Sequence, residues 1–175
     1  RLWKLLKSYF YGAKQLFKNL SGRMSDMKPV HHQQKIIYTG DQKIDTGLHS
    51  ISEVSGYLWE KGWAERNGGN ISIRISLPEQ SASQFFRFSD DKAPLFSPLS
   101  KLSGAIFYTT GAGSRMRDVA RDPLGNGCFL KIGDDGLYYT LQAGSGVLPT
   151  SELPSHLRSE ERRVGKEFRF GWSPY

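Results

Sequence analysis

Three short loops in the sequence carry residue types suited to binding an anion. They are residues 67–70 (Asn-Gly-Gly-Asn), residues 110–113 (Thr-Gly-Ala-Gly) and residues 150–152 (Thr-Ser-Glu). Glycines let a ligand approach the backbone closely, and amides and hydroxyls are neutral hydrogen-bond donors. The third loop also precedes an expected helix, whose first backbone N–H groups form a ready anion site. Each loop therefore suits a phosphate group.

Each loop also has a purely structural interpretation. Asn and Gly are the usual residues of a helix-to-strand turn, so residues 67–70 taken alone are more simply a turn. Residues 110–113 lack the Gly-Lys-Ser/Thr of a nucleotide loop, and Met116 stands where a dinucleotide motif has its third glycine. Thr, Ser and an early Glu are favoured at a helix start, so Glu152 alone is typical of a capping residue.

The residues that could bind a metal show no suitable spacing. Cys128 is the single cysteine, which excludes a disulfide within the chain and any Cys-rich metal site. The four histidines, His31, His32, His49 and His156, contain no pair that would lie on one face of a helix or strand. We interpret all four as surface or packing residues.

The positive charge of the chain belongs to its two ends. The 175 residues have a formal net charge of +7, of which residues 1–23 contribute +6 and residues 158–175 contribute +2. Residues 24–157 have a net charge of −1, so the body indicates no nucleic-acid partner. No apolar run approaches the length of a membrane span, and we expect no membrane partner.

Both ends differ from the body. Residues 1–27 are either a basic amphipathic leader or upstream sequence translated in frame, with the true start at Met24 or Met27. Residues 158–167 match, in order, the translation of a common sequencing-library adapter, although a solvated charged helix has a similar composition. We predict that residues 158–175 are an adapter-derived artefact and that the domain occupies residues 28–157.

The body predicts helices packed on a sheet. Ser50 and Glu53 form a capping-box pattern for a helix that ends near Gly62. Residues 71–76 alternate between Ile and polar residues, which indicates a half-buried strand. The other expected elements are a loop-like stretch at 77–104, strands at 105–110, 128–132 and 137–143, a hairpin turn at 133–136, a short helix capped by Ser114, and a helix that opens at 149–152.

Two longer runs resemble a known family. Residues 56–70 (Gly-Tyr-Leu-Trp-Glu-Lys-Gly-Trp-Ala-Glu-Arg-Asn-Gly-Gly-Asn) and residues 149–156 (Pro-Thr-Ser-Glu-Leu-Pro-Ser-His) are similar to the class II aldolase/adducin-like family, in particular to rhamnulose-1-phosphate aldolases. The resemblance covers roughly residues 51–157. It implies an α/β fold with three αβα layers, in which a mixed, mostly antiparallel sheet lies between helices.

The resemblance also implies an activity. The family member would be an aldehyde-lyase of rhamnose metabolism, a cytoplasmic homotetramer that uses zinc to cleave rhamnulose 1-phosphate into dihydroxyacetone phosphate and lactaldehyde. Glu152 would move the proton on a carbon of dihydroxyacetone phosphate. The residues that would hold the substrate phosphate are Asn67, Gly69, Asn70, Gly111, Gly113, Thr150 and Ser151.

The chain departs from the family pattern in two respects. Ala112 stands where the family has a serine, and the nearby Ser114 is a candidate to replace its hydroxyl. The zinc-binding histidines lie downstream of the Ser-Glu-Leu-Pro run in the family, and no residue of this sequence maps to them. We therefore expect that this chain binds no metal and is inactive by itself.

Related functions remain open on the same residues. Fuculose-phosphate aldolases, pentulose-phosphate epimerases and dehydratases share the phosphate loops, and adducin-like proteins use the fold as a non-catalytic interaction module. The run at residues 56–70 favours the rhamnulose type, and the presence of Glu152 with both phosphate loops argues against an interaction module.

Overall fold

The computed structural model describes residues 38–64, 66 and 68–167 of the 175. The chain divides into two units, residues 1–36 and 37–175, and the described residues all lie in the second. The segment 1–27, the predicted phosphate ligand Asn67 and the last residues, 168–175, lie outside the described part.

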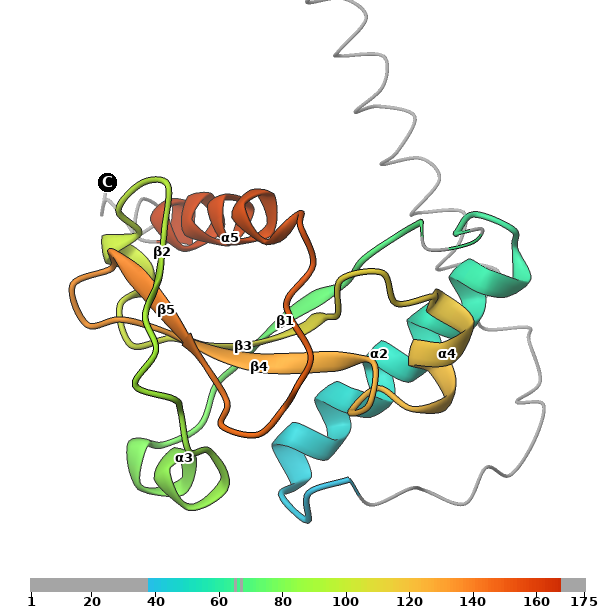
Figure 1. The fold of residues 1–175 in the computed structure, drawn as a ribbon, viewed down its shortest axis with the longest axis horizontal. Coiled ribbons are helices and arrows are strands. Elements are labelled where there is room, and N and C mark those ends of the chain that lie inside the picture. The colour runs from blue at the N-terminus through green and yellow to red at the C-terminus, as the bar shows by residue number, and fades with distance from the viewer. Residues whose placement is uncertain (1–37, 65, 67, 168–175) are drawn as a thin grey trace, which may run out of the picture. The chain divides into compact units, whose positions relative to one another are not determined.

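An antiparallel sheet forms the centre of the described unit (Figure 1). Its strands lie in the order β1-β3-β4-β5-β2, and every neighbouring pair among the described strands is antiparallel. Their bounds are β1 Ser72–Ile75, β2 Ala93–Pro94, β3 Ile106–Thr110, β4 Gly127–Ile132 and β5 Tyr138–Leu141. The strands and the hairpin turn that the alternation and the turn residues predicted are thereby confirmed.

Helices cover both faces of this sheet (Figure 1). Helix α2 (Gln42–Glu60) and the short helix α4 (Met116–Arg121) pack on one face, and α5 (Leu153–Glu167) packs on the other. Two smaller elements, α3 (Glu79–Phe85) and the 3₁₀ helix η1 (Ser100–Leu102), lie in the stretch that was predicted to be loop-like. The arrangement confirms the predicted three-layer α/β fold.

Alternation along β3 and β4 divides the core between the two faces. Tyr108 and Phe129 point towards α2, whereas Phe107 and Leu130 point towards α5. The core on the α2 face consists of Ile44, Leu48, Ile51, Ala64, Ile75, Phe86, Ile106, Tyr108, Met116, Val119 and Phe129. The core on the α5 face consists of Leu99, Leu102, Ala105, Phe107, Leu130, Ile132, Leu153, Leu157 and Val164.

Helix α2 begins nine residues before the predicted start. Its N-cap is Asp41, whose Oδ1 accepts hydrogen bonds from the backbone N–H groups of Lys43 at 2.8 Å and Ile44 at 3.0 Å. The predicted cap, Ser50, lies inside the helix and donates its hydroxyl to the carbonyl of Thr46 at 3.0 Å. A serine followed by a glutamate also fits a helix interior, because the hydroxyl can bond back to the preceding turn.

Two further boundaries differ from the prediction. Helix α4 begins at Met116 without a side-chain cap, so Ser114 does not cap it. Helix α5 continues past Leu157, where the family-like sequence was expected to end, to Glu167. A stretch rich in Glu and Arg favours a helix whatever its origin, so this continuation follows from composition.

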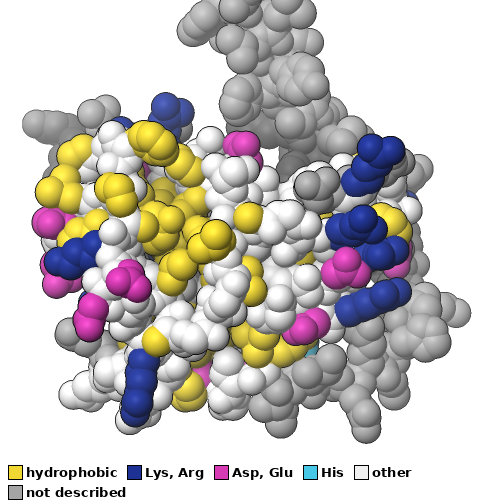
Figure 2. All heavy atoms as spheres, viewed as in Figure 1, with side chains coloured by type: hydrophobic (Ala, Val, Ile, Leu, Met, Phe, Trp, Pro, Cys, Tyr) yellow, Lys and Arg dark blue, Asp and Glu magenta, His cyan; other side chains and the backbone are white. Residues whose placement is uncertain are grey.

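Hydrophobic side chains gather on one part of the surface. In the view of Figure 2 they cluster over the region of α5, β2 and β5, whereas Lys and Arg gather at the opposite edge, near α4. Phe96 is 95% exposed and Leu148 is 67% exposed. No helix of the described residues is long and apolar enough to cross a membrane.

Candidate active site

The three predicted loops meet at Thr110, the last residue of β3. The backbone N–H of Thr110 donates to the carbonyl of Ile71 at 3.0 Å, and its hydroxyl accepts from the N–H of Ile71 at 3.1 Å. Its carbonyl accepts from the N–H of Thr150 at 3.0 Å. Thr110 is only 1% exposed, so these bonds are shielded from water. Backbone and hydroxyl hydrogen bonds of Thr110 thus join the second loop to Ile71, which follows the first loop, and to Thr150, which begins the third.

The second and third loops also pair along their backbones. Gly111 forms an antiparallel bridge with Pro149, and the N–H of Ala112 donates to the carbonyl of Leu148 at 2.9 Å. A Cβ on Gly111 would lie 2.5 Å from a side-chain carbon of Val147 and 2.9 Å from the hydroxyl oxygen of Ser114. Close packing therefore requires glycine at position 111, and it places the Ser114 hydroxyl beside the loop.

The first loop needs glycine for its backbone conformation. Gly69 has φ of +87°, in the left-handed region where a Cβ is strained. A Cβ there would also lie 3.1 Å from the Cβ of Ala64, which is buried. Gly69 therefore fixes the turn that leads into Asn70 and β1.

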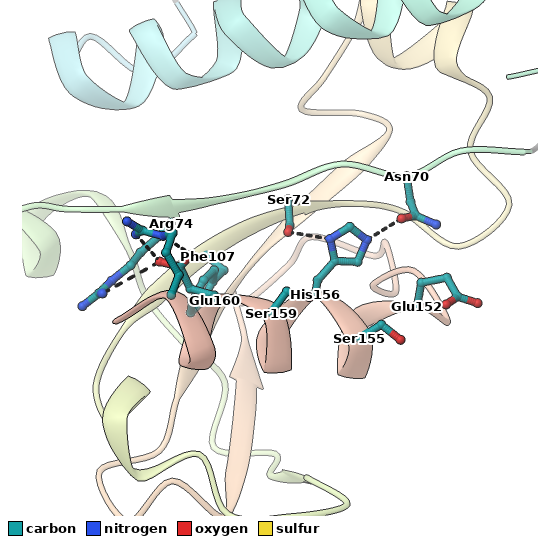
Figure 3. Close-up of a pocket in the computed structure, with 10 residues that line it drawn as sticks. Asn70, Ser72, Arg74, Phe107, Glu152, Ser155, His156, Ser159 and Glu160 are labelled. Atoms are coloured by element: carbon teal, nitrogen blue, oxygen red, sulfur yellow. Dashed lines mark hydrogen bonds and ion pairs between the residues drawn. The ribbon is translucent and has the colours of Figure 1, made fainter. Parts of the chain in front are cut away.

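Asn70 and Glu152 line the same open cavity, between α5 and β1 (Figure 3). Its volume is about 510 Å³. Glu152 immediately precedes α5, and its backbone N–H donates to the hydroxyl of Thr150 at 3.3 Å. The other lining residues are Ser72, Arg74, Phe107, Ser155, His156, Ser159, Glu160 and Arg163.

His156 connects the two sides of this cavity. Its ring Nδ1 lies 2.9 Å from the hydroxyl of Ser72, and its Nε2 contacts the side-chain oxygen of Asn70 (Figure 3). Burial lowers the pKa of His156 below its ordinary value, while the nearby charge of Glu152 acts in the opposite direction. The neutral imidazole is therefore favoured at neutral pH.

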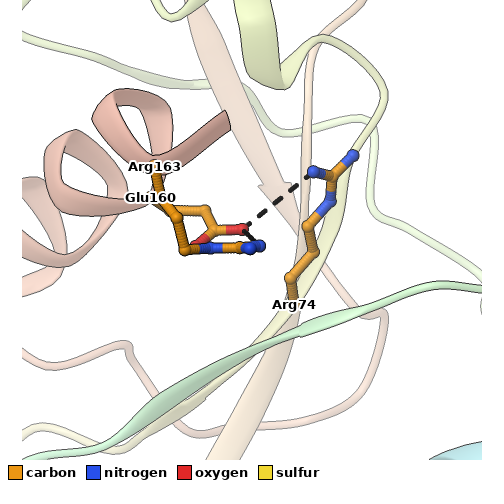
Figure 4. A network of polar contacts seen from close by, with 3 residues as sticks. All are labelled: Arg74, Glu160 and Arg163. Atoms are coloured by element: carbon orange, nitrogen blue, oxygen red, sulfur yellow. Dashed lines mark hydrogen bonds and ion pairs between the residues drawn. The ribbon is translucent and has the colours of Figure 1, made fainter. Parts of the chain in front are cut away.

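Charged residues compensate one another at the other end of the cavity (Figure 4). The carboxylate of Glu160 lies 2.6 Å from an Nη of Arg163 and 4.0 Å from an Nη of Arg74. The hydrogen bond from Arg163 lowers the pKa of Glu160, burial opposes that shift, and the charges of both arginines add to it. Glu160 is thus kept ionised in this network.

The other predicted site residues lie beside the cavity rather than in its lining. Thr150 is buried, and its hydroxyl and backbone belong to the turn before α5. Ser151, Gly69 and Gly113 are exposed on the same group of loops. The interpretation of His156 as an ordinary surface or packing residue missed its place in the cavity. Its position four residues after Glu152 was a usable signal, because residues at that spacing share one helix face.

The chain is similar to known aldolases over most of its length. It is 41% identical over 138 residues to a rhamnulose-1-phosphate aldolase of Bacteroides thetaiotaomicron, covering 73% of this chain and 46% of that protein. It is 39% identical over 120 residues to a rhamnulose-1-phosphate aldolase of Yersinia pseudotuberculosis, covering 67% and 44%. No protein-family model matches the chain.

A solved structure supports the same relationship. The fold matches the crystal structure of a sugar-phosphate aldolase from Thermotoga maritima with a TM-score of 0.53 and 29% sequence identity, covering 71% of this chain and 50% of that one. Over the matched stretch, the chain is thus similar in sequence and in fold to aldolases that act on sugar phosphates. It spans slightly less than half the length of the curated relatives named above.

The class II aldolases suggest zinc, but the described residues do not fit a zinc site. Among them, no group of three or more His, Cys, Asp or Glu side chains could hold a metal ion. Both ring nitrogens of His156 already contact Ser72 and Asn70. Cys128 is buried, which raises the pKa of its thiol to about 12. The described residues therefore form no metal centre.

Proposed function

We propose that this chain forms the phosphate-binding and proton-transfer part of a sugar-phosphate aldolase. The substrate we infer for the parent protein is rhamnulose 1-phosphate, and its products are dihydroxyacetone phosphate and lactaldehyde. The observation that supports this most is the meeting of the three loops at Thr110, with Asn70 and Glu152 lining one cavity. The names of the curated relatives favour the rhamnulose substrate.

Neutral donors would hold the substrate phosphate. The side-chain amide of Asn70 and the exposed backbone at Gly69 and Gly113 belong to the loops that are joined at Thr110. The start of α5 adds the hydroxyl of Ser151 and the positive end of a 15-residue helix. The resemblance adds Asn67, the backbone at Gly111 and Thr150. Ser114 would supply the hydroxyl that Ala112 lacks, since it lies against Gly111.

Glu152 would transfer the proton at carbon. In cleavage, the hydroxyl on the carbon that becomes the aldehyde of lactaldehyde releases its proton to water and forms the C=O bond. The carbon–carbon bond between the two products breaks, and its electron pair stays on the dihydroxyacetone phosphate carbon as an enediolate. The protonated carboxyl of Glu152 would then donate its proton to that carbon, and the carboxylate would accept it in the reverse reaction. Because Glu152 is exposed in the cavity, a substrate anchored at the loops can reach it.

The parent enzyme and this chain differ in what we expect of them. We propose that the parent uses zinc, which in such enzymes acts as a Lewis acid on the ketose oxygens. Since no residue of this sequence maps to the family's ligands, we expect the 175-residue chain to bind the phosphorylated ligand without turning it over. The cytoplasmic location and the homotetramer implied by the resemblance stay predictions.

The test is an assay of the complete parent protein. It should release dihydroxyacetone phosphate from rhamnulose 1-phosphate faster than from fuculose 1-phosphate, and Asn70→Ala should raise KM with little change in kcat. Release from neither ketose phosphate, under conditions where a rhamnulose-1-phosphate aldolase is active, would overturn the proposal. Faster release from fuculose 1-phosphate would change the substrate and leave the reaction class intact.

A further inference from the structure

The side-chain oxygen of Asn70 faces Nε2 of His156, and this contact decides which ring nitrogen carries the hydrogen. The side-chain oxygen of an asparagine can only accept a hydrogen bond, so Nε2 of His156 must carry the hydrogen that it donates to Asn70 Oδ1. In the neutral ring, Nδ1 is then an acceptor, and the hydroxyl of Ser72, 2.9 Å away, is its donor. The hydrogen bonds thus run in one direction, from Ser72 through His156 to Asn70.

This direction has a consequence for the other end of the amide. With Oδ1 held by the ring, the nitrogen of the Asn70 side chain is turned away from His156, as Figure 3 shows. That nitrogen carries two N–H donors and no acceptor. A flipped amide would instead present the lone pairs of its oxygen, which repel an anion.

We propose that His156 is a positioning residue that holds the Asn70 amide with its N–H groups presented to the substrate phosphate. The proposal rests on the proposed function, in which Asn70 binds that phosphate. His156 is well placed for this task because it lies on the first turns of α5, a rigid helix, while Asn70 lies in a loop that enters an edge strand. His156 also lies four residues after Glu152, and both side chains line the same cavity.

A simple packing role makes a different prediction. If His156 only filled space, an apolar residue of similar size would suffice, and the loss of its N–H would leave phosphate affinity unchanged. If His156 orients the Asn70 amide, the N–H of its ring is the essential group. Removing that N–H should then lower the affinity for phosphorylated ligands but not for ligands without a phosphate. The two roles can therefore be distinguished by comparing ligands with and without a phosphate, and variants with and without an N–H donor at position 156.

The test measures binding of dihydroxyacetone phosphate to the 175-residue chain by calorimetry, with dihydroxyacetone as the ligand that lacks the phosphate. His156→Leu removes the donor, whereas His156→Gln keeps an N–H at a similar reach. We expect His156→Leu to weaken dihydroxyacetone phosphate about tenfold and His156→Gln to stay within roughly threefold of the wild type, because a hydrogen bond to a charged group is at stake. The double variant with Asn70→Ala should lose no more than Asn70→Ala alone.

The possible failures are distinguishable. If the wild-type chain does not prefer dihydroxyacetone phosphate to dihydroxyacetone, the proposed phosphate site and this inference both fail. If it does, and His156→Leu binds as tightly as the wild type or adds its full loss to that of Asn70→Ala, only the inference fails. Nitrogen NMR of the unsubstituted chain gives a check that needs no variant: a His156 ring protonated on Nδ1 alone would overturn the inference.

Discussion

The two faces of the sheet are built differently, although they share the same strands. On the α2 face, Leu48 and Tyr108 belong to a continuous apolar core and are fully buried. On the α5 face, the apolar core gives way towards β1 to a cavity lined by polar residues, including Ser72 and His156. The comparison teaches that one face of this sheet supplies stability while the other leaves room for a ligand.

The largest expected effect is on the α2 face. Leu48→Ala removes a fully buried side chain between α2 and the sheet, and we expect the free energy of unfolding to fall by roughly 2–5 kcal/mol. Urea denaturation would measure it. Leu148→Ala is the matched control, because Leu148 is 67% exposed and its loss should cost less than about 0.5 kcal/mol. Equal losses for the two variants would refute this division of the molecule.

The next effect is on the α5 face and concerns turnover. In the complete parent enzyme, Glu152→Gln keeps the size of the side chain but removes the proton-transfer group, so kcat should fall at least roughly a hundredfold. The melting temperature should stay unchanged, since Glu152 is exposed. Glu53→Gln is the matched control on α2 and should keep full activity. Near-normal turnover of Glu152→Gln would reduce this residue to a helix cap.

A smaller effect is expected at the start of α2. Asp41→Ala removes the acceptor of two backbone N–H groups, those of Lys43 and Ile44, and should cost about 1 kcal/mol of stability. Thermal unfolding would measure the loss. Asp91→Ala, at an exposed loop position, should be close to neutral. No difference between the two aspartate variants would mean that the cap contributes nothing.

The smallest effect is a pH dependence that arises from His156. Because burial lowers the pKa of His156 in the folded chain, the unfolded chain binds a proton more readily. The contribution of neutral His156 to stability is therefore complete above the ordinary pKa of about 6.5. It is lost as the pH falls through the lower pKa that His156 has in the folded chain. Chemical denaturation at several pH values should show a shallower loss of stability in His156→Gln than in the wild type. Identical curves would mean that His156 does not titrate differently on folding.

Local patterns in the sequence were sufficient to predict where the strands and the loops lie. Alternation located β1 and β3, and glycines marked the turns, because these signals depend on neighbouring residues. The alternation along β1 also predicted one buried and one polar face. The sequence could not show that Ser72 and Arg74 on the polar face line a cavity beneath α5, because α5 is about 80 residues away along the chain.

The same reason explains the missed contact of His156. Its partner Asn70 is 86 residues earlier in the sequence, so only the fold brings the two together. The early start of α2 was missed for a different reason, since Ser50 and Glu53 satisfied a cap pattern that occurs inside helices as well. The half-buried strand predicted at residues 71–76 does place its isoleucines on the core side, since Ile73 and Ile75 pack towards α2 and Ile75 is only 7% exposed.

The junction at Thr110 has a consequence for how the chain folds. Asn70, Thr110 and Thr150 are each about forty residues apart, so the contacts among their loops close long stretches of chain. Contacts of this kind form late in folding and make folding slower, because each must offset the entropy lost when a long stretch of chain is closed into a loop. A partly folded chain would therefore have no assembled phosphate site. Phosphorylated ligands should bind only the native state and shift the unfolding equilibrium in proportion to the logarithm of their concentration, which makes ligand-induced stabilisation a direct report of complete folding.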